Sequence, residues 1–154
     1  MANAYSKLYV QIVFTPRGRL QISNSDLRIL VEKYIYGILA NLSCHVLALK
    51  CMPDHIHILT SIHPDRSVSE IVRTIKANSS KHLNEIKAFP GMFHWQQGYG
   101  AFSYSQSSIP NVVHYINNQE EHHQRMSFED EYKSFLNSFQ IDYNPAYLFD
   151  RATD

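Results

Sequence analysis

The chain of 154 residues lacks an excess of charge of either sign. Lysine and arginine together number 14, and aspartate and glutamate together also number 14, so the formal net charge is zero. Dedicated duplex-DNA-binding proteins usually carry a basic excess. The balance therefore counts against non-specific duplex binding, although it leaves room for a local basic groove.

Cysteines and long apolar runs are also scarce. Cys44 and Cys51 are the only cysteines, and two thiols in a chain without a secretion signal are more often buried and free than bridged. No apolar run approaches the roughly 20 residues of a membrane-spanning helix, and the first residues lack a charged start followed by an apolar core. We therefore expect a soluble, cytoplasmic protein with no membrane partner.

Apolar residues, histidines and aromatic rings are abundant. Apolar residues make up 44% of the chain, and there are 9 histidines, 10 tyrosines and 8 phenylalanines. The length and the absence of a linker or repeat indicate a single domain over residues 1–154. Imidazoles titrate near neutral pH, and flat rings stack on unpaired bases.

The spacing of apolar residues predicts alternating strands and helices. Period-two alternation predicts strands over 7–15, 45–52, 55–62, 93–96 and 101–105. Apolar residues three and four apart predict helices over about 27–42, 68–86, 108–123 and 127–139. Ser23 or Ser25 is the expected cap of the first helix, and Ser67 with Glu70 forms a capping box for the second.

The order of these elements is strand, helix, strand, strand, helix, strand, followed by extra helices. This order predicts an α+β fold of the ferredoxin-like βαββαβ kind, with an antiparallel sheet and additional C-terminal helices. Because the two crossover helices pack on one face of such a sheet, we expect the other face to be open and to carry the functional site.

The stretch PDHIHIL (53–59) places two histidines on one predicted strand. Residues two apart point to the same side of a strand, so His55 and His57 present adjacent imidazoles while Ile56 and Ile58 pack. A single histidine is most simply an ordinary polar residue, but such a pair suits a divalent metal ion. Two imidazoles alone hold an ion weakly, so a third ligand is expected elsewhere.

The predicted helix 108–123 carries a second set of polar side chains. Tyr115 and Gln119 are four residues apart and share one face beside an apolar edge. A half-buried tyrosine with a solvated glutamine is the simpler explanation of this pair alone. His122 and His114 are candidate bases near Tyr115, and His123 complements the helix dipole.

Four segments together resemble a known family: PDHIHIL (53–59), KANSSKHLNE (76–85), WQQGYGAFSYS (95–105) and VVHYINNQEEHH (112–123). They are similar to the single-tyrosine HUH transposases, where HUH denotes His-hydrophobic-His. These are small enzymes of minimal insertion sequences, and their REP-associated relatives act on repetitive palindromes. The resemblance extends from about residue 5 to the fourth predicted helix.

The resemblance implies a specific chemistry. His55, His57 and Gln119 would bind a divalent metal, Mg or Mn, and Mn is the better match because Mg prefers oxygen ligands. Tyr115 would attack single-stranded DNA beside a hairpin, leaving a 5′-phosphotyrosine and a free 3′-OH. A second 3′-OH would reverse the step without a nucleotide cofactor. A homodimer is implied, in which the tyrosine helix of many members completes the partner's site.

Basic and aromatic residues supply candidate DNA contacts. The basic candidates are Arg17, Arg19, Lys50, Arg73, Lys76 and Lys81. Each is most simply a solvated side chain on its own. The rings that could stack on bases are Trp95, Tyr99, Phe102 and Tyr104, of which Trp95 and Phe102 fit better in the core. Gly98 and Gly100 flank Tyr99 and mark either a tight turn or a hinge.

Two other functions fit parts of the sequence. A non-catalytic ferredoxin-like module that binds nucleic acid would explain the fold and the rings, but it gives no role to His55, His57, Tyr115 and Gln119. A zinc hydrolase would use the same histidines, but the chain lacks the adjacent glutamate of an H-E-x-x-H motif.

Overall fold

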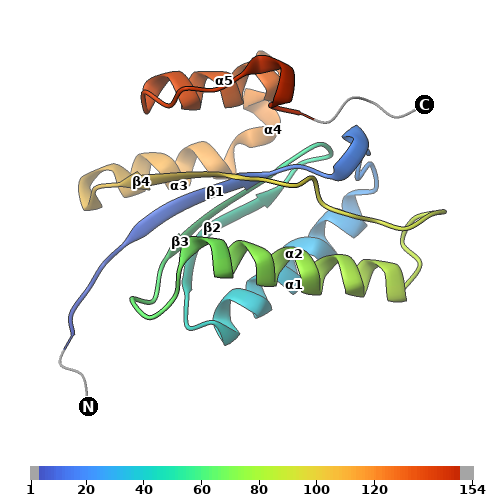
Figure 1. The fold of residues 1–154 in the computed structure, drawn as a ribbon, viewed down its shortest axis with the longest axis horizontal. Helices are drawn as coiled ribbons and strands as arrows, with labels where there is room; N and C mark the ends of the chain where they lie inside the picture. Colours follow the sequence, from blue (N-terminus) through green and yellow to red (C-terminus); the bar gives the residue numbers. More distant parts are fainter. Residues whose placement is uncertain (1–3, 150–154) are drawn as a thin grey trace.

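Four antiparallel strands form the sheet at the centre of the molecule, in the order β2–β3–β1–β4 (Figure 1). The strands are β1 (Tyr9–Phe14), β2 (His45–Cys51), β3 (Ile56–Ser61) and β4 (Gly100–Tyr104). This computed structural model describes residues 4–149. Helix α1 (Ser25–Asn41) connects β1 to β2, and α2 (Val68–Glu85) connects β3 to β4. The ferredoxin-like α+β prediction is therefore confirmed.

Helices α1 and α2 cover one face of the sheet and form the larger core. Alternate residues of β1 and β3 point toward them, as the period-two pattern predicts. The buried residues on this side include Ile12, Phe14, Val31, Ile35, Ile56, Ile58, Ile71 and Ile75. Burying one such isoleucine side chain contributes about 1.5–3 kcal/mol, so this core fixes the registers of the central strands.

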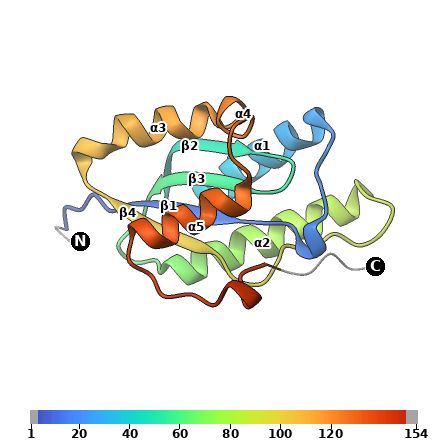
Figure 2. The same cartoon turned by 90° about the horizontal axis from the view of Figure 1, so that it is seen from above.

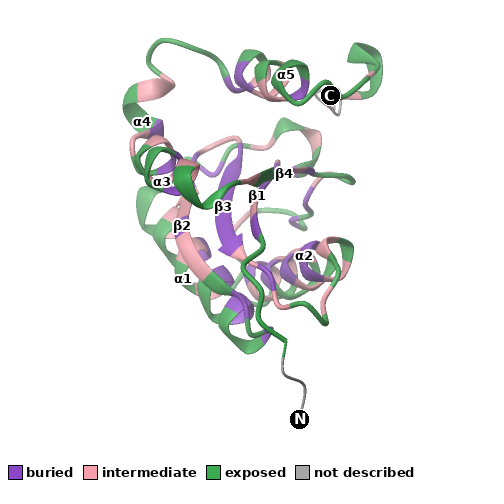
Figure 3. Ribbon diagram, turned by 90° about the vertical axis from the view of Figure 1, so that its left-hand side faces the viewer, coloured by how far each residue is buried: buried purple, intermediate pink, exposed green. Residues whose placement is uncertain are grey.

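The opposite face is also covered, by α3 (Ile109–Asn117) and α5 (Phe128–Ser138) (Figure 2). Helix α3 packs on β2 and β3 through Tyr9, Ala48, Leu59, Ile109, Val112 and Ile116. Helix α5 packs on β1 and β4 through Val13, Phe102, Phe128 and Leu136. The expectation of an open face is therefore wrong. Strands β1 and β3 lie buried between two helical layers (Figure 3).

The helix expected over 108–123 is divided into two. Helix α3 ends at Asn117, and the short helix α4 (Gln119–His122) begins after Asn118, whose φ is −108° and ψ 26°. The side-chain amide of Asn118 donates to the carbonyl oxygen of His114 at 2.7 Å. This local bond competes with helical geometry. Tyr115 and Gln119 consequently lie on different helices.

Other local expectations are partly met. Ser67 Oγ accepts the backbone N–H of Glu70 at 3.1 Å, as the capping box predicts. Asn24 caps α1, in place of either serine, by accepting two backbone N–H groups. Residues 93–96 contain no strand, since Trp95 forms only an isolated bridge with Pro16. The part of the chain that the structure describes also has three 3₁₀ turns: η1 (Arg17–Arg19), η2 (Gln106–Ser108) and η3 (Pro145–Tyr147).

Cys44 and Cys51 are both buried free thiols, as predicted. Within residues 4–149, every helix is too short or too polar to cross a bilayer.

Candidate active site

The two histidines lie at the start of β3, on the face opposite Ile56 and Ile58. Both are buried, and their ring centroids are 5.0 Å apart. His55 Nδ1 lies 2.7 Å from Asp54 Oδ1, and His57 Nδ1 lies 2.7 Å from Gln11 Oε1. A ring whose Nδ1–H is held by an oxygen acceptor presents the Nε2 lone pair, which is the usual arrangement of a metal-binding histidine.

Tyr115 and Gln119 lie against this pair of histidines. Gln119 is fully buried, and its Oε1 atom lies 3.2 Å from His55 Nε2. The Tyr115 and His57 ring centroids are 6.1 Å apart. The Tyr115 hydroxyl lies 3.1 Å from His122 Nε2. The structure therefore brings together the four residues that sequence reasoning proposed for the metal and the nucleophile.

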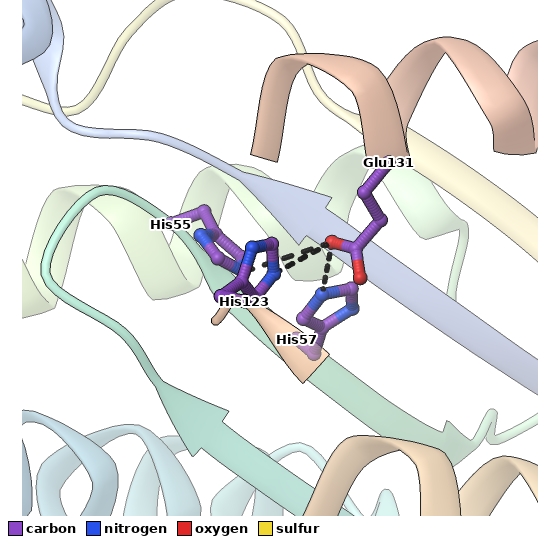
Figure 4. A group of neighbouring side chains, drawn as sticks. All are labelled: His55, His57, His123 and Glu131. Atoms are coloured by element: carbon purple, nitrogen blue, oxygen red, sulfur yellow. Dashed lines mark hydrogen bonds and ion pairs between the residues drawn. The ribbon is translucent and has the colours of Figure 1, made fainter. Parts of the chain in front are cut away.

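Two further residues belong to the cluster. His55, His57, His123 and Glu131 each offer a ligand atom, and these atoms all lie within 4.8 Å of one another (Figure 4). Glu131 projects from α5 and is 2% exposed. Its Oε1 atom lies 3.0 Å from His57 Nε2, and its Oε2 atom accepts the Tyr115 hydroxyl.

Sequence reasoning missed Glu131 and gave His123 only a dipole role. One signal was available for Glu131. Phe128, Glu131 and Phe135 are spaced by three and four residues, which places a carboxylate in the apolar stripe of α5. A charged residue in such a stripe is rarely buried without a partner.

Burial and neighbouring charge shift the pKa values in the cluster. Burial lowers the pKa of His57 to about 4. Burial, with the adjacent Glu131 carboxylate, raises the pKa of Tyr115. Burial alone would also raise the pKa of Glu131, but the neighbouring imidazoles of His123 and His57 hold it well below its usual value. The free protein therefore holds an ionised carboxylate beside a protonated phenol.

Several predicted DNA-binding residues gather at a separate cavity of about 770 Å³ between α2 and the segment before β4. Arg17, Arg73 and Lys76 line it together with Trp95 and Tyr99. Arg17 and Arg73 are exposed. The cavity thus combines positive charge with aromatic surface.

Lys76 lines this basic cavity and contacts the segment before β4. Its Nζ atom donates to the backbone carbonyls of Gln96 and Gly98, and burial lowers the pKa of Lys76 to about 8. Gly98 has a φ of +92°, in the region that favours glycine. Tyr99 is 40% exposed. These contacts describe a defined turn before β4, the simpler of the two roles expected for the glycines.

The remaining candidates lie outside the cavity. Arg19 extends toward Glu129, with 3.6 Å between their charged atoms, and Lys50 lies 3.2 Å from Glu120. Lys81 is exposed on α2 but does not line the cavity. Trp95 and Phe102 are buried in the core, as expected.

The family is decided by a sequence match. The family model described as "Transposase IS200 like" matches residues 4–119 of the chain. The chain belongs to the IS200-like transposase family. The match begins before β1 and ends at Gln119, so α5 and Glu131 of this IS200-like transposase lie beyond the matched range.

Individual relatives of the chain are also transposases. The IS200-like transposase is 21% identical to ISDra2 transposase TnpA of Deinococcus radiodurans over 120 residues, which cover 73% of this chain and 84% of that one. A solved transposase from Deinococcus radiodurans R1 superposes with a TM-score of 0.61 at 21% identity, covering 77% of this chain and 95% of that chain.

A second solved structure also covers α5. It is a REP-associated tyrosine transposase bound to a REP hairpin, with a TM-score of 0.60 at 16% identity, covering 100% of this chain and 93% of that chain. The predicted resemblance to tyrosine transposases is therefore confirmed, and the fold of the IS200-like transposase is that of these proteins.

Proposed function

We propose that this IS200-like transposase cleaves and rejoins single-stranded DNA beside a hairpin, with Tyr115 as the nucleophile. The observation that carries the proposal is the position of the Tyr115 hydroxyl. It lies in one site with the two histidines of β3, linked to His57 through Glu131. A cavity of about 440 Å³ opens onto Tyr115, His122 and Glu131, and it offers a path for a DNA strand.

The proposed step exchanges one phosphate ester for another. Tyr115 Oη forms a bond to phosphorus, and the bond from phosphorus to the 3′ oxygen of the preceding nucleotide breaks. The 3′ oxygen leaves as a hydroxyl by taking a proton from solvent. The phenol proton passes to Glu131, whose Oε2 accepts the Tyr115 hydroxyl, and from there to His122, whose Nε2 lies 3.2 Å from the same oxygen and whose side chain is 28% exposed. The phosphotyrosine retains the ester's energy, so a second 3′-OH can reverse the step without a nucleotide cofactor.

The residues present fit a divalent metal. His55 and His57 would hold it through Nε2 and Gln119 through Oε1, because these donors converge and both Nδ1 atoms are already engaged. A bound Mn or Mg ion supplies positive charge that stabilises the oxygens of the scissile phosphate. His55 and His57 would be held rigid by Asp54 and Gln11, so little ordering would be needed on binding.

The basic cavity is the proposed DNA-binding surface. Arg17, Arg73 and Lys76, which line it, would contact phosphates, as would Arg19 and Lys81 outside it, while the exposed ring of Tyr99 would stack on an unpaired base. The hairpin bound to the REP-associated relative supports a hairpin substrate. We further propose that the protein acts in the cytoplasm as a homodimer.

The test is formation of a covalent protein–DNA adduct. Labelled hairpin oligonucleotides with single-stranded flanks are incubated with Mn or Mg, and adducts are resolved on a denaturing gel. We expect the wild-type protein and a Tyr36→Phe control to form the adduct, since Tyr36 is an exposed residue of α1. Tyr115→Phe should form none while it binds the hairpin with unchanged affinity. An adduct formed by Tyr115→Phe would show that the nucleophile is another residue.

A non-catalytic nucleic-acid-binding module is the second candidate. The basic cavity with its exposed Tyr99 favours it, because that surface would bind single strands whether or not Tyr115 reacts. This function predicts hairpin binding by the wild-type protein and no adduct with any metal.

A further inference from the structure

The histidine cluster contains more hydrogen-bond acceptors than protons. Each of three Nδ1 atoms lies 2.7 or 2.8 Å from an oxygen acceptor: His55 from Asp54, His57 from Gln11 and His123 from the carbonyl of Met126. A neutral imidazole has one N–H. With the Nδ1 atoms protonated, all three Nε2 atoms are lone-pair acceptors.

The Nε2 atoms nevertheless face oxygens. Glu131 Oε1 lies 3.0, 3.3 and 3.7 Å from Nε2 of His57, His123 and His55. Gln119 Oε1 lies 2.8 Å from His123 Nε2 and 3.2 Å from His55 Nε2. The amide orientation of Gln119 is fixed because its Nε2 donates to Glu131 Oε2 at 3.3 Å. The lone pairs of the histidine Nε2 atoms thus face the lone pairs of the Glu131 and Gln119 oxygens.

A cation resolves this arrangement. The ligand atoms of His55, His57, His123 and Glu131 all lie within 4.8 Å of one another, so a single divalent ion would accept their lone pairs. Glu131 Oε1 is the oxygen that lies within 3.7 Å of the Nε2 atoms of all three histidines.

We propose that Glu131 and His123 complete the metal site that His55 and His57 begin. This inference rests on the proposed function and adds ligands to its metal site. Three imidazoles and an amide carry no negative charge, whereas Glu131 supplies one and a hard oxygen donor that suits Mn and Mg. Glu131 Oε2 also accepts the Tyr115 hydroxyl, so the same carboxylate positions the nucleophile beside the ion.

The packing of α5 fixes this carboxylate. Phe128, one turn before Glu131, stacks on His55 with ring centroids 4.1 Å apart and an interplanar angle of 11°. Phe135, one turn after it, stacks on Phe102 at 5.1 Å. Glu131 thus lies in the sequence between two anchored rings. Its side chain projects from α5 into the cluster (Figure 4). Because α5 lies beyond residue 119, this ligand comes from outside the matched family range.

The experiment measures Mn²⁺ binding to the full chain without DNA, by calorimetry and by electron paramagnetic resonance of the free ion. Glu131→Gln preserves the side-chain shape, and we expect at least a tenfold weaker Kd. Glu129→Gln is the matched control, since Glu129 lies on the same helix but pairs with Arg19 and Lys133. Its Kd should stay within twofold of wild type. His123→Asn should also weaken binding at least tenfold.

The other variants separate failure of this inference from failure of the proposed function. If His57→Ala loses Mn²⁺ and Glu131→Gln binds like wild type or more tightly, Glu131 is not a ligand and the inference is overturned. The proposed function would still stand on the Tyr115 adduct. If circular dichroism shows that Glu131→Gln does not fold, His123→Asn decides, and an unchanged Kd for that variant overturns the inference.

Discussion

The ammonium group of Lys76 is partly buried by the fold and so loses part of its hydration. Burial lowers the pKa of this lysine to about 8, so its ammonium loses its charge as the pH rises through that value. We predict that hairpin affinity falls about two- to tenfold between pH 7 and pH 9, with a shallower salt dependence at the higher pH. Fluorescence anisotropy with the Tyr115→Phe protein measures this without cleavage.

The control for Lys76 is a side chain that stays charged. Lys76→Arg should bind with little pH dependence over the same range, because a guanidinium keeps its proton. Lys81→Arg, on the same helix outside the cavity, should behave like the parent protein. An equal loss of affinity in Lys76→Arg would assign the pH dependence to another group.

Residues of the site could be predicted from the sequence only where their spacing along one strand or one helix places them on a shared face. His55 and His57 are two apart on one strand, and Tyr115 and Gln119 are four apart, so their shared faces follow from backbone geometry. Their roles stay predictions. Glu131 is 74 positions from His57, and their contact depends on how α5 packs. No local period encodes such a distance.

At the scale of elements, β4 and α5 approach each other closely at Gly100. A Cβ atom added there would lie 2.7 Å from Tyr132 Cε1 and 2.8 Å from its hydroxyl oxygen. We predict that Gly100→Ala lowers the free energy of unfolding by about 1–3 kcal/mol and weakens Mn²⁺ binding by moving α5. Urea unfolding monitored by circular dichroism measures the first effect.

Gly37 provides the matched substitution. It lies inside α1, and an added Cβ meets nothing within 4 Å. Gly37→Ala should therefore stabilise the protein by about 0.5–1 kcal/mol through helix propensity. Adding Tyr132→Ala to Gly100→Ala removes the clashing ring and should restore Mn²⁺ binding toward that of Tyr132→Ala alone. If Gly37→Ala and Gly100→Ala had equal free energies of unfolding, the close contact between Gly100 and Tyr132 would be contradicted.

Elements were easier to predict than their arrangement. The strand periods and the Ser67 capping box express local physics, and the βαββαβ order then limits the topology. The break at Asn118 was missed because it accompanies one side-chain hydrogen bond that the spacing of apolar residues does not reveal. The covered second face was missed because the sequence shows that Val13 and Phe102 are apolar but not which helix covers them. In the structure they pack against α5.

At the scale of the whole molecule, a single chain holds all the groups of the proposed site. His57, Glu131 and Tyr115 contact one another within one subunit. We therefore predict that mixing His57→Ala with Tyr115→Phe restores no adduct above the sum of the separate proteins, even if light scattering shows a dimer. A site shared between subunits would give active mixed dimers, so recovered adduct would contradict this prediction.

The end of the matched family range at Gln119 has a practical consequence for surveys of related genomes. Sequences trimmed to that boundary would be sorted by their histidines and tyrosine alone, and the acidic position of α5 would be discarded before any comparison. Transposases that differ at the position of Glu131 would then appear identical. Retaining some twenty further residues in each retrieved sequence, about the distance from Gln119 to the end of α5, would separate them.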